Sequence, residues 1–239
     1  MSLSSNESLG IVFLHHTADE ITRANFASFR RWNPGETIIS VSAGDALENG
    51  YSIREIAGAA AIWESRTNSL NRRAESADLL LYLWYPSRRE FCDKWLIVEW
   101  DAYCEMPARD FLSNVWEFPI SGPSIRLPNR ENEWHWFQHV ADFPVDLQPY
   151  ATGIVPFCFI QIADYVLANV YRLASSLELE AGNCELRLPT LASALGFPAV
   201  ANPRADGKIT WQAHPVDTEI TEGMWHPIKW LRRYRDQNA

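Results

Sequence analysis

The stretch WLIVEWD, at residues 95–101, leads four large apolar residues directly into two carboxylates spaced one residue apart. A short apolar run bounded by charge predicts a strand buried on both faces, as in a parallel sheet. Because residues i and i+2 of a strand share a face, we expect Glu99 and Asp101 to face one point where the strand leaves the core. Open α/β sheets bind ligands at that edge, and carboxylate oxygens suit magnesium or manganese, which hold phosphates. The alternative is a pair of solvated loop residues.

Strands and helices alternate through the first hundred residues. Two capping boxes, Thr17 with Glu20 and Ser52 with Glu55, predict helices, of which the first ends before Pro34 and the second near residue 71. The predicted strands are residues 10–15, 37–42, 78–85 and 95–99. This order indicates a Rossmann-like parallel sheet. No Gly-x-Gly-x-x-Gly follows the first strand, so a dinucleotide site is not supported.

The second half of the chain is less regular. Its pattern predicts a short helix at 107–112, a loop at 119–128, a helix at 129–140 and a long, largely apolar helix at 156–177. A segment at 185–196 is expected to begin extended and become a helix. A short strand at 208–211 and an amphipathic helix at 226–235 complete the prediction.

Composition narrows the partners and the compartment. The 239 residues carry a net charge of −9, which argues against nucleic acid as the main partner, because a phosphate backbone needs clustered Lys and Arg. The four cysteines form no Cys-x-x-Cys pair and are expected to be reduced thiols of a cytoplasmic protein. No segment approaches the roughly 18 apolar residues of a membrane span, and the N-terminus lacks the pattern of a signal peptide.

The order of these parts resembles the nucleotide-diphospho-sugar glycosyltransferases of the A-type fold. The resemblance implies an α/β fold with a single Rossmann-like mixed sheet flanked by helices. It also implies one domain over residues 1–239, with a nucleotide-binding half at 10–105 and an acceptor-binding half at 106–239. In that family a strand leads into an Asp-x-Asp motif that binds a metal ion. Here the motif stands as Glu99-Trp100-Asp101, with glutamate replacing the first aspartate.

The same resemblance implies a reaction and its site. The reaction is transfer of a sugar from a nucleotide-diphosphate sugar, of the uridine diphosphate type, to a glycan or small-molecule acceptor. Mn²⁺ or Mg²⁺ would stabilise the leaving diphosphate. Asp101 is the expected direct ligand, and Glu99 contacts either the metal, directly or through water, or the ribose. His226, in Trp-His-Pro-Ile-Lys, resembles the late histidine ligand, with His214 as its rival.

The remaining candidates are assigned to three roles. Glu185 is the candidate catalytic base, although Arg187 two residues later makes a plain ion pair an alternative. The candidate nucleotide-binding residues are His16, Thr17, Asp45, Arg73, Arg88 and Lys229. The candidate acceptor-binding residues are Thr152, Gly153 and Trp136.

Two other functions compete with sugar transfer. A metal-dependent phosphohydrolase would also place carboxylates at strand ends. Dehalogenase-type enzymes, however, carry Asp-x-Asp after the first strand, where this chain reads His-His-Thr-Ala-Asp. A catalytically degenerate transferase fold, which binds a nucleotide or a glycan without turnover, is the other alternative.

Overall fold

A computed structural model describes residues 6–48, 50–67, 76–125, 135–177, 183–210 and 212–230, with the backbone alone for residues 135–138. In this part of the chain, seven strands form one sheet in the order β3-β2-β1-β4-β7-β6-β8, and β5 pairs with β9 separately. The strands are β1 Leu9–His15, β2 Thr37–Ser42, β3 Tyr51–Ser52, β4 Lys94–Glu99, β5 Tyr103–Cys104, β6 Ile120–Gly122, β7 Ile160–Ala163, β8 Val200–Ala201 and β9 Met224–Trp225.

Six α-helices are described alongside these strands, together with short 3₁₀-helices. The α-helices are α1 Glu20–Trp32, α2 Ala59–Arg66, α4 Ala77–Trp84, α5 Ala108–Leu112, α6 Asp164–Leu177 and α7 Cys184–Ala194. The 3₁₀-helices are η1 Ile53–Glu55, η2 Tyr85–Ser87, η3 His135–Asp142, η4 Gln148–Tyr150 and η5 Pro203–Ala205.

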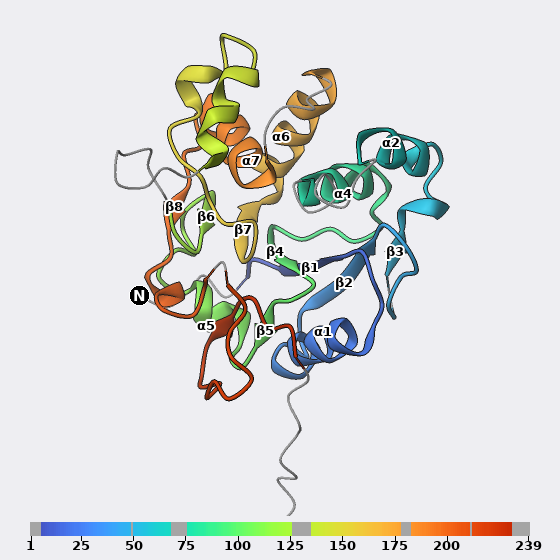
Figure 1. Cartoon of the computed structure of the whole chain (residues 1–239), viewed down its shortest axis with the longest axis vertical. Helices are drawn as coiled ribbons and strands as arrows, with labels where there is room; N and C mark the ends of the chain where they lie inside the picture. Colours follow the sequence, from blue (N-terminus) through green and yellow to red (C-terminus); the bar gives the residue numbers. More distant parts are fainter. Residues whose placement is uncertain are drawn as a thin grey trace, which may run out of the picture.

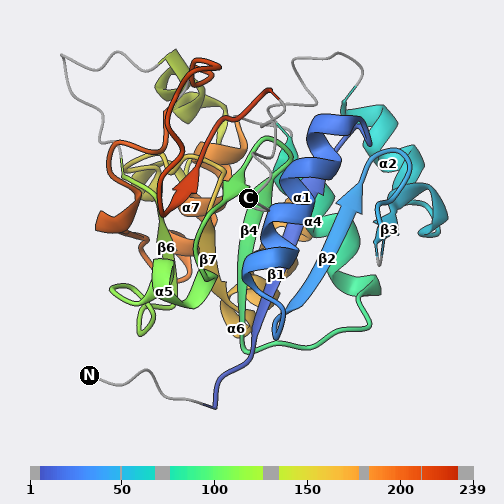
Figure 2. The same ribbon diagram turned by 90° about the horizontal axis from the view of Figure 1, so that it is seen from below.

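β1 lies inside a parallel half-sheet, because it pairs in parallel with both β2 and β4. Its run of apolar residues is buried at every position, as expected for a strand covered on both faces. The register places Leu14 opposite Glu99, so β1 and β4 end at the same edge of the sheet. Figure 2 shows β1, β2 and β4 side by side. The segments that follow these three strands therefore meet at one edge.

The other half of the sheet runs in mixed directions. β7 pairs antiparallel with β4, β6 pairs antiparallel with β7, and β8 runs parallel to β6. The predicted fold class, a single mixed sheet flanked by helices, is confirmed.

Helices cover both faces of the sheet. Figure 1 shows α2, α4, α6 and α7 on one side and α1 and α5 on the other. Successive residues of β1 alternate between two apolar cores: Val12 and Leu14 pack on the α4 side, whereas Ile11 and Phe13 pack on the α1 side. None of the described helices combines the length and the apolar character needed to cross a bilayer.

One predicted strand and one predicted helix, both inferred from apolar runs, are wrong. Residues 78–85, predicted as a strand, form most of helix α4, which is buried at every position but one. A helix buried all round has no apolar stripe, so its sequence period does not distinguish it from a buried strand. The apolar run at 156–177 contains strand β7 before α6 begins at Asp164.

Four more predictions in the second half are wrong in the residues that the structure describes. Strand β6 lies within the predicted loop at 119–128. Helix α7 begins without an extended part, because Asn183 Oδ1 accepts a hydrogen bond from Glu185 N at 2.7 Å and caps it. Of the predicted strand at 208–211, residues 208–210 form only a bridge, Ile209 with His226, and residue 211 lies outside the described residues. Of the predicted helix at 226–235, residues 226–230 are not helical and bond to other segments, and residues 231–235 lie outside the described residues.

The helix starts also differ from the predicted capping boxes. Asp19, and not Thr17, caps α1, because Asp19 Oδ1 accepts from Thr22 N at 2.8 Å. Ser52 caps only η1, and Gly58 in a left-handed conformation precedes α2. Of the predicted helix at 129–140, residues 129–134 lie outside the described residues and the rest belongs to η3.

A buried ion pair joins α4 to α7. Arg187 donates from Nε to Asp78 Oδ2 at 2.7 Å and from Nη2 to Asp78 Oδ1 at 2.5 Å. The two side chains are 6% and 0% exposed, so each charge depends on the other for compensation.

Asp78→Asn should therefore lower the free energy of unfolding by about 3–5 kcal/mol, because it leaves the Arg187 guanidinium buried without a counter-charge. Urea denaturation measures this loss. The matched control is Glu48→Gln, which removes the exposed ion pair with Arg30 and should cost less than about 1 kcal/mol. A loss for Asp78→Asn no larger than that of the control would contradict the account.

Candidate active site

Three side chains converge where β4 ends. The Nε2 atom of His226 lies 3.1 Å from Asp101 Oδ1 and 3.5 Å from Glu99 Oε2. Each residue offers one potential ligand atom, and these atoms all lie within 4.8 Å of one another. The structure thus brings together the three residues that the sequence singled out as metal ligands.

A buried asparagine holds this arrangement. Asn25 of α1 donates from Nδ2 to the carbonyl oxygens of Trp100 and Ile228, each at 3.1 Å. Ile228 N in turn donates to Asp101 O at 2.7 Å. Three segments far apart in the sequence are therefore fixed to one another beside the cluster. Sequence reasoning missed Asn25, since an asparagine within a helix carries no signal of its distant partners.

The cluster is strongly polarised. Burial lowers the pKa of His226, but Cys158, Asp101 and Glu99 outweigh burial and hold that pKa well above its ordinary value. Burial acts to raise the pKa of Asp101, but the hydrogen bond and charge of His226, together with Lys229, bring it below its ordinary value. Burial prevails at Glu99 and raises its pKa despite His226. Without metal, an imidazolium faces an ionised Asp101 at neutral pH.

The donor set fits a divalent cation. Neighbouring ligands of an octahedral Mg²⁺ ion with bonds of about 2.0–2.1 Å lie about 3 Å apart. The Nε2–Oδ1 and Nε2–Oε2 separations of 3.1 and 3.5 Å are close to that spacing. Two carboxylates suit Mg²⁺ or Mn²⁺, and the imidazole shifts the preference towards Mn²⁺.

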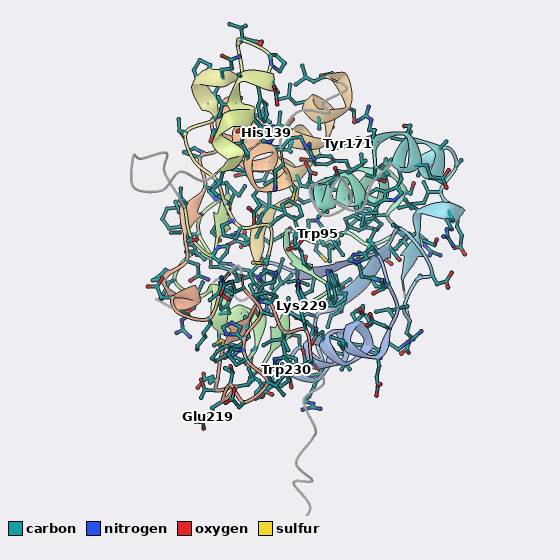
Figure 3. The ribbon with its side chains drawn as sticks, viewed as in Figure 1. Trp95, His139, Tyr171, Glu219, Lys229 and Trp230 are labelled. Atoms are coloured by element: carbon teal, nitrogen blue, oxygen red, sulfur yellow. The ribbon has the colours of Figure 1, made fainter. Side chains whose placement is uncertain are left out.

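Lys229 and Trp100 extend the cluster towards the ends of β1 and β2. Lys229 Nζ lies 3.5 Å from Asp101 Oδ2 and 5.5 Å from the centre of the Trp100 ring. Figure 3 shows Lys229 in the middle of the molecule, on the C-terminal segment. The Trp100 ring meets the His16 ring edge to face, with their centres 5.4 Å apart. His16, Trp100 and Lys229 thus form a continuous row that ends at the carboxylates.

A small cavity of about 110 Å³ lies beside this row. It is lined by His16, by Ala43 and Gly44 after β2, and by residues of η1 and α2. Asp45 follows Gly44, is exposed and lies 3.8 Å from Arg54, another lining residue. Thr17 lies next to His16, but its hydroxyl bonds to Asp19 and Thr22.

A proline inside α7 links Glu185 to the segment after η4. Pro189 has no N–H, so the carbonyl of Glu185, four residues earlier, lacks its helical partner. Val155 N donates to that carbonyl instead, at 2.9 Å. The bond holds Val155 against the first turn of α7. Thr152 and Gly153, two of the predicted acceptor-binding residues, lie just before Val155 in the sequence.

Glu185 also lies within electrostatic range of the cluster. Burial raises the pKa of Cys158 to about 11, against the lowering effect of His226, and both Glu99 and Glu185 add to the rise. Burial raises the pKa of Cys184 well above its ordinary value, and the same two carboxylates contribute there as well. Glu99 and Glu185 therefore both lie close enough to these two thiols for their charges to act on them.

Other candidates do not join this group. Arg88 lies near the start of β4, where its Nη1 donates to Tyr85 O at 2.8 Å and its Nη2 lies 3.4 Å from Asp164. His214, the rival ligand, donates from Nε2 to Lys208 O at 3.0 Å and packs on Trp225. Arg73 and the side chain of Trp136 lie outside the described residues.

Comparison with known proteins gave matches in structure alone. No protein-family model matches the chain, and no curated protein matches it in sequence. The galactosyltransferase LgtC in complex with donor and acceptor sugar analogues shares 16% identity at a TM-score of 0.46, over 82% of this chain and 74% of that one. An active-site mutant of LgtC gives 12% identity and a TM-score of 0.46, over 96% and 91%. Mouse xyloside xylosyltransferase 1 gives 11% identity and a TM-score of 0.42, over 81% and 84%.

The chain is similar in fold to glycosyltransferases. At this level of similarity, its function has to be argued from its own residues.

The raised pKa of His226 predicts that metal binding releases a proton. A histidine binds metal in its neutral form, so Mn²⁺ must displace the proton that His226 carries at pH 7. Affinity should rise with pH until the pH exceeds the pKa of His226 in the metal-free protein. Calorimetry of Mn²⁺ binding in buffers of different ionisation enthalpy measures the release. Binding enthalpies that are equal in all buffers would contradict a protonated His226.

Proposed function

We propose that this protein is a metal-dependent glycosyltransferase that takes its sugar from a nucleoside-diphosphate donor of the uridine type. The observation that carries the proposal is the Glu99–Asp101–His226 cluster with Lys229 beside it. A cation site and a lysine at the carboxyl end of a parallel strand are what a diphosphate requires.

The donor would lie along the row from the small cavity to the cluster. The base of the nucleoside would enter the cavity beside His16 and Gly44, with Asp45 at its edge. Trp100 offers an aromatic face between that cavity and the carboxylates. Lys229 holds its ammonium group next to Asp101, where the diphosphate would lie. Residues 10–105 thus supply most of the nucleotide site, and the later half supplies His226 and Lys229.

Glu99, Asp101 and His226 would hold Mn²⁺ or Mg²⁺. When bound, such an ion neutralises the charge that develops on the leaving diphosphate. Asn25 keeps the cluster in place without touching it directly, because it fixes the backbone on both sides. The buried surroundings strengthen each of these charge interactions.

Glu185 would act on the acceptor. In an inverting transfer, its carboxylate takes the proton of the acceptor hydroxyl while the hydroxyl oxygen bonds to the anomeric carbon. The bond from that carbon to the diphosphate oxygen breaks, and the diphosphate leaves with the electron pair. Thr152 and Gly153, held near α7 through Val155, would contact the acceptor glycan or small molecule.

Asp101→Asn tests the metal site. It should reduce the affinity for uridine diphosphate in the presence of Mn²⁺ at least tenfold, because the amide keeps the shape of the carboxylate but not its charge. Calorimetric titration of uridine diphosphate, with and without Mn²⁺, measures how its affinity depends on the metal and on Asp101. Asp110→Asn, on the exposed face of α5, is the control and should bind like the wild type. Tight binding that ignores both the metal and Asp101→Asn would exclude the mechanism.

Glu185→Gln tests the base. The variant should keep metal-dependent nucleotide binding but lose about 10²–10⁴-fold in turnover, since a positioned base contributes about that much. Release of uridine diphosphate from nucleotide sugars measures turnover, and the exposed Glu117→Gln is the control. Full turnover by Glu185→Gln would remove Glu185 as base. Binding without any release in the wild type would favour a degenerate, binding-only fold.

A further inference from the structure

A second cavity, of about 450 Å³, lies among α2, α4, α6 and α7, on the side of the sheet away from α1. Tyr171 of α6 stands at its wall, between α6 and α4 in Figure 3. Helix α2 separates it from the small cavity at the ends of β1 and β2: Ala59 lines the larger cavity and Ala60 the smaller. A volume of this size is typical of sites for small organic ligands.

The cavity contains a buried hydroxyl that is poorly satisfied. The Oη atom of Tyr82 is buried and makes no hydrogen bond of good geometry within the described part of the chain, and its contact with the Asp78 carboxylate is only a weak one. The residue as a whole is 8% exposed. Burial, and then the charge of Asp78, raise the pKa of Tyr82 well above its ordinary value, so the phenol remains a donor at neutral pH. A buried hydroxyl that is poorly satisfied costs stability, and a ligand that bonds to it would recover that loss.

The neighbouring groups match one kind of ligand. Asp78 and Arg187, which also line the cavity, neutralise each other. Arg66, at the end of α2, adds one positive charge to the lining, and its guanidinium can donate to the hydroxyl or ring oxygens of a ligand. Serine hydroxyls from Ser76, Ser87 and Ser175 add small groups that both donate and accept. Apolar walls complete the lining, with Ile62, Leu79 and Tyr171 among them.

We propose that this cavity binds a glycosyl group, an uncharged ring that carries several hydroxyls. Such a ring offers donors and acceptors at its rim and C–H groups on its faces, which the mixed lining accommodates. The proposal rests on the proposed function for the choice of sugars, but its residues are separate from the metal cluster. The glycosyl group belongs either to the donor or to a free saccharide.

The position of α7 connects the two sites. Glu185 and Arg187 lie two residues apart on the first turns of α7, so they point to nearly opposite sides of the helix. Arg187 lines the cavity, while the charge of Glu185 acts on Cys158 beside His226. A sugar in the cavity would therefore lie directly behind the proposed catalytic base.

The first test is Tyr82→Phe, which deletes the poorly satisfied hydroxyl alone. Because that hydroxyl makes no hydrogen bond of good geometry within the described part of the chain, the melting temperature should change little or rise. Saccharide affinity should fall about five- to twentyfold, the effect of one lost hydrogen bond. Tyr165→Phe, on the exposed side of α6, is the control and should change neither quantity.

The second test blocks the cavity without touching its ion pair. Ser175 is exposed and lines the cavity, whereas its neighbour Ser176 is exposed and does not. Ser175→Trp should abolish saccharide binding, and Ser176→Trp should leave it intact.

The probes are uridine diphosphate, its glucose and galactose conjugates, and free glucose, galactose and lactose, all with Mn²⁺. Ligand-observed NMR and calorimetry measure their binding. If the donor supplies the ring, the conjugates bind more tightly than uridine diphosphate, and Tyr82→Phe removes that difference. If a free saccharide supplies it, the free sugars bind and Tyr82→Phe weakens them.

Either of these results supports the cavity as a sugar site. Sugars that bind the wild type, Tyr82→Phe and Ser175→Trp equally, or no binding by any of them, would overturn it. Uridine diphosphate titrated alone reports on the proposed function separately, since its binding does not involve Tyr82.

Discussion

The contact between His226 and Asp101 is the interaction on which the account of this protein depends. It joins the end of a central strand to a segment near the other end of the chain, with 3.1 Å between Nε2 and Oδ1. Both side chains are largely buried. Their contact depends on the position of the backbone segments that carry them. Asn25 and the Ile228–Asp101 hydrogen bond fix that position. These hydrogen bonds hold the segment that carries His226 against the end of β4.

The mixed sheet explains why the cluster lies where it does. β1, β2 and β4 run in parallel and end at one edge, which gathers His16, Gly44 and Trp100 there. β7 then pairs antiparallel with β4. The helices that follow β7, α6 and α7, cover the face of the sheet opposite the one that α1 covers. One edge thus carries the charged groups. The layer formed by α2, α4, α6 and α7 encloses a cavity with an ion pair and a poorly satisfied phenol.

The sequence predicted the parts of the fold that depend on local signals. Strands β1, β2 and β4 are short runs of branched or aromatic residues between polar ones, and the structure confirms them. Helix α4 was mistaken for a strand because its residues are apolar on all sides, which removes the period that separates the two structures. Strand β7 was hidden for a similar reason, since the apolar run continues from the strand into α6.

The site shows the same division. Glu99, Asp101 and His226 were found from residue type and order along the chain, and the structure places them together. Asn25, Cys158 and the Asp78–Arg187 pair were missed, because their roles arise from contacts between distant segments.

The central claim is that a divalent cation binds between Asp101 and His226 when a nucleoside diphosphate is present. An anomalous difference map at the manganese edge, from crystals grown with Mn²⁺ and uridine diphosphate, tests it most directly. The account predicts a peak within bonding distance of Asp101 and His226 that also contacts the diphosphate. A bound nucleotide with no peak there, and with His226 still against Asp101, would contradict it.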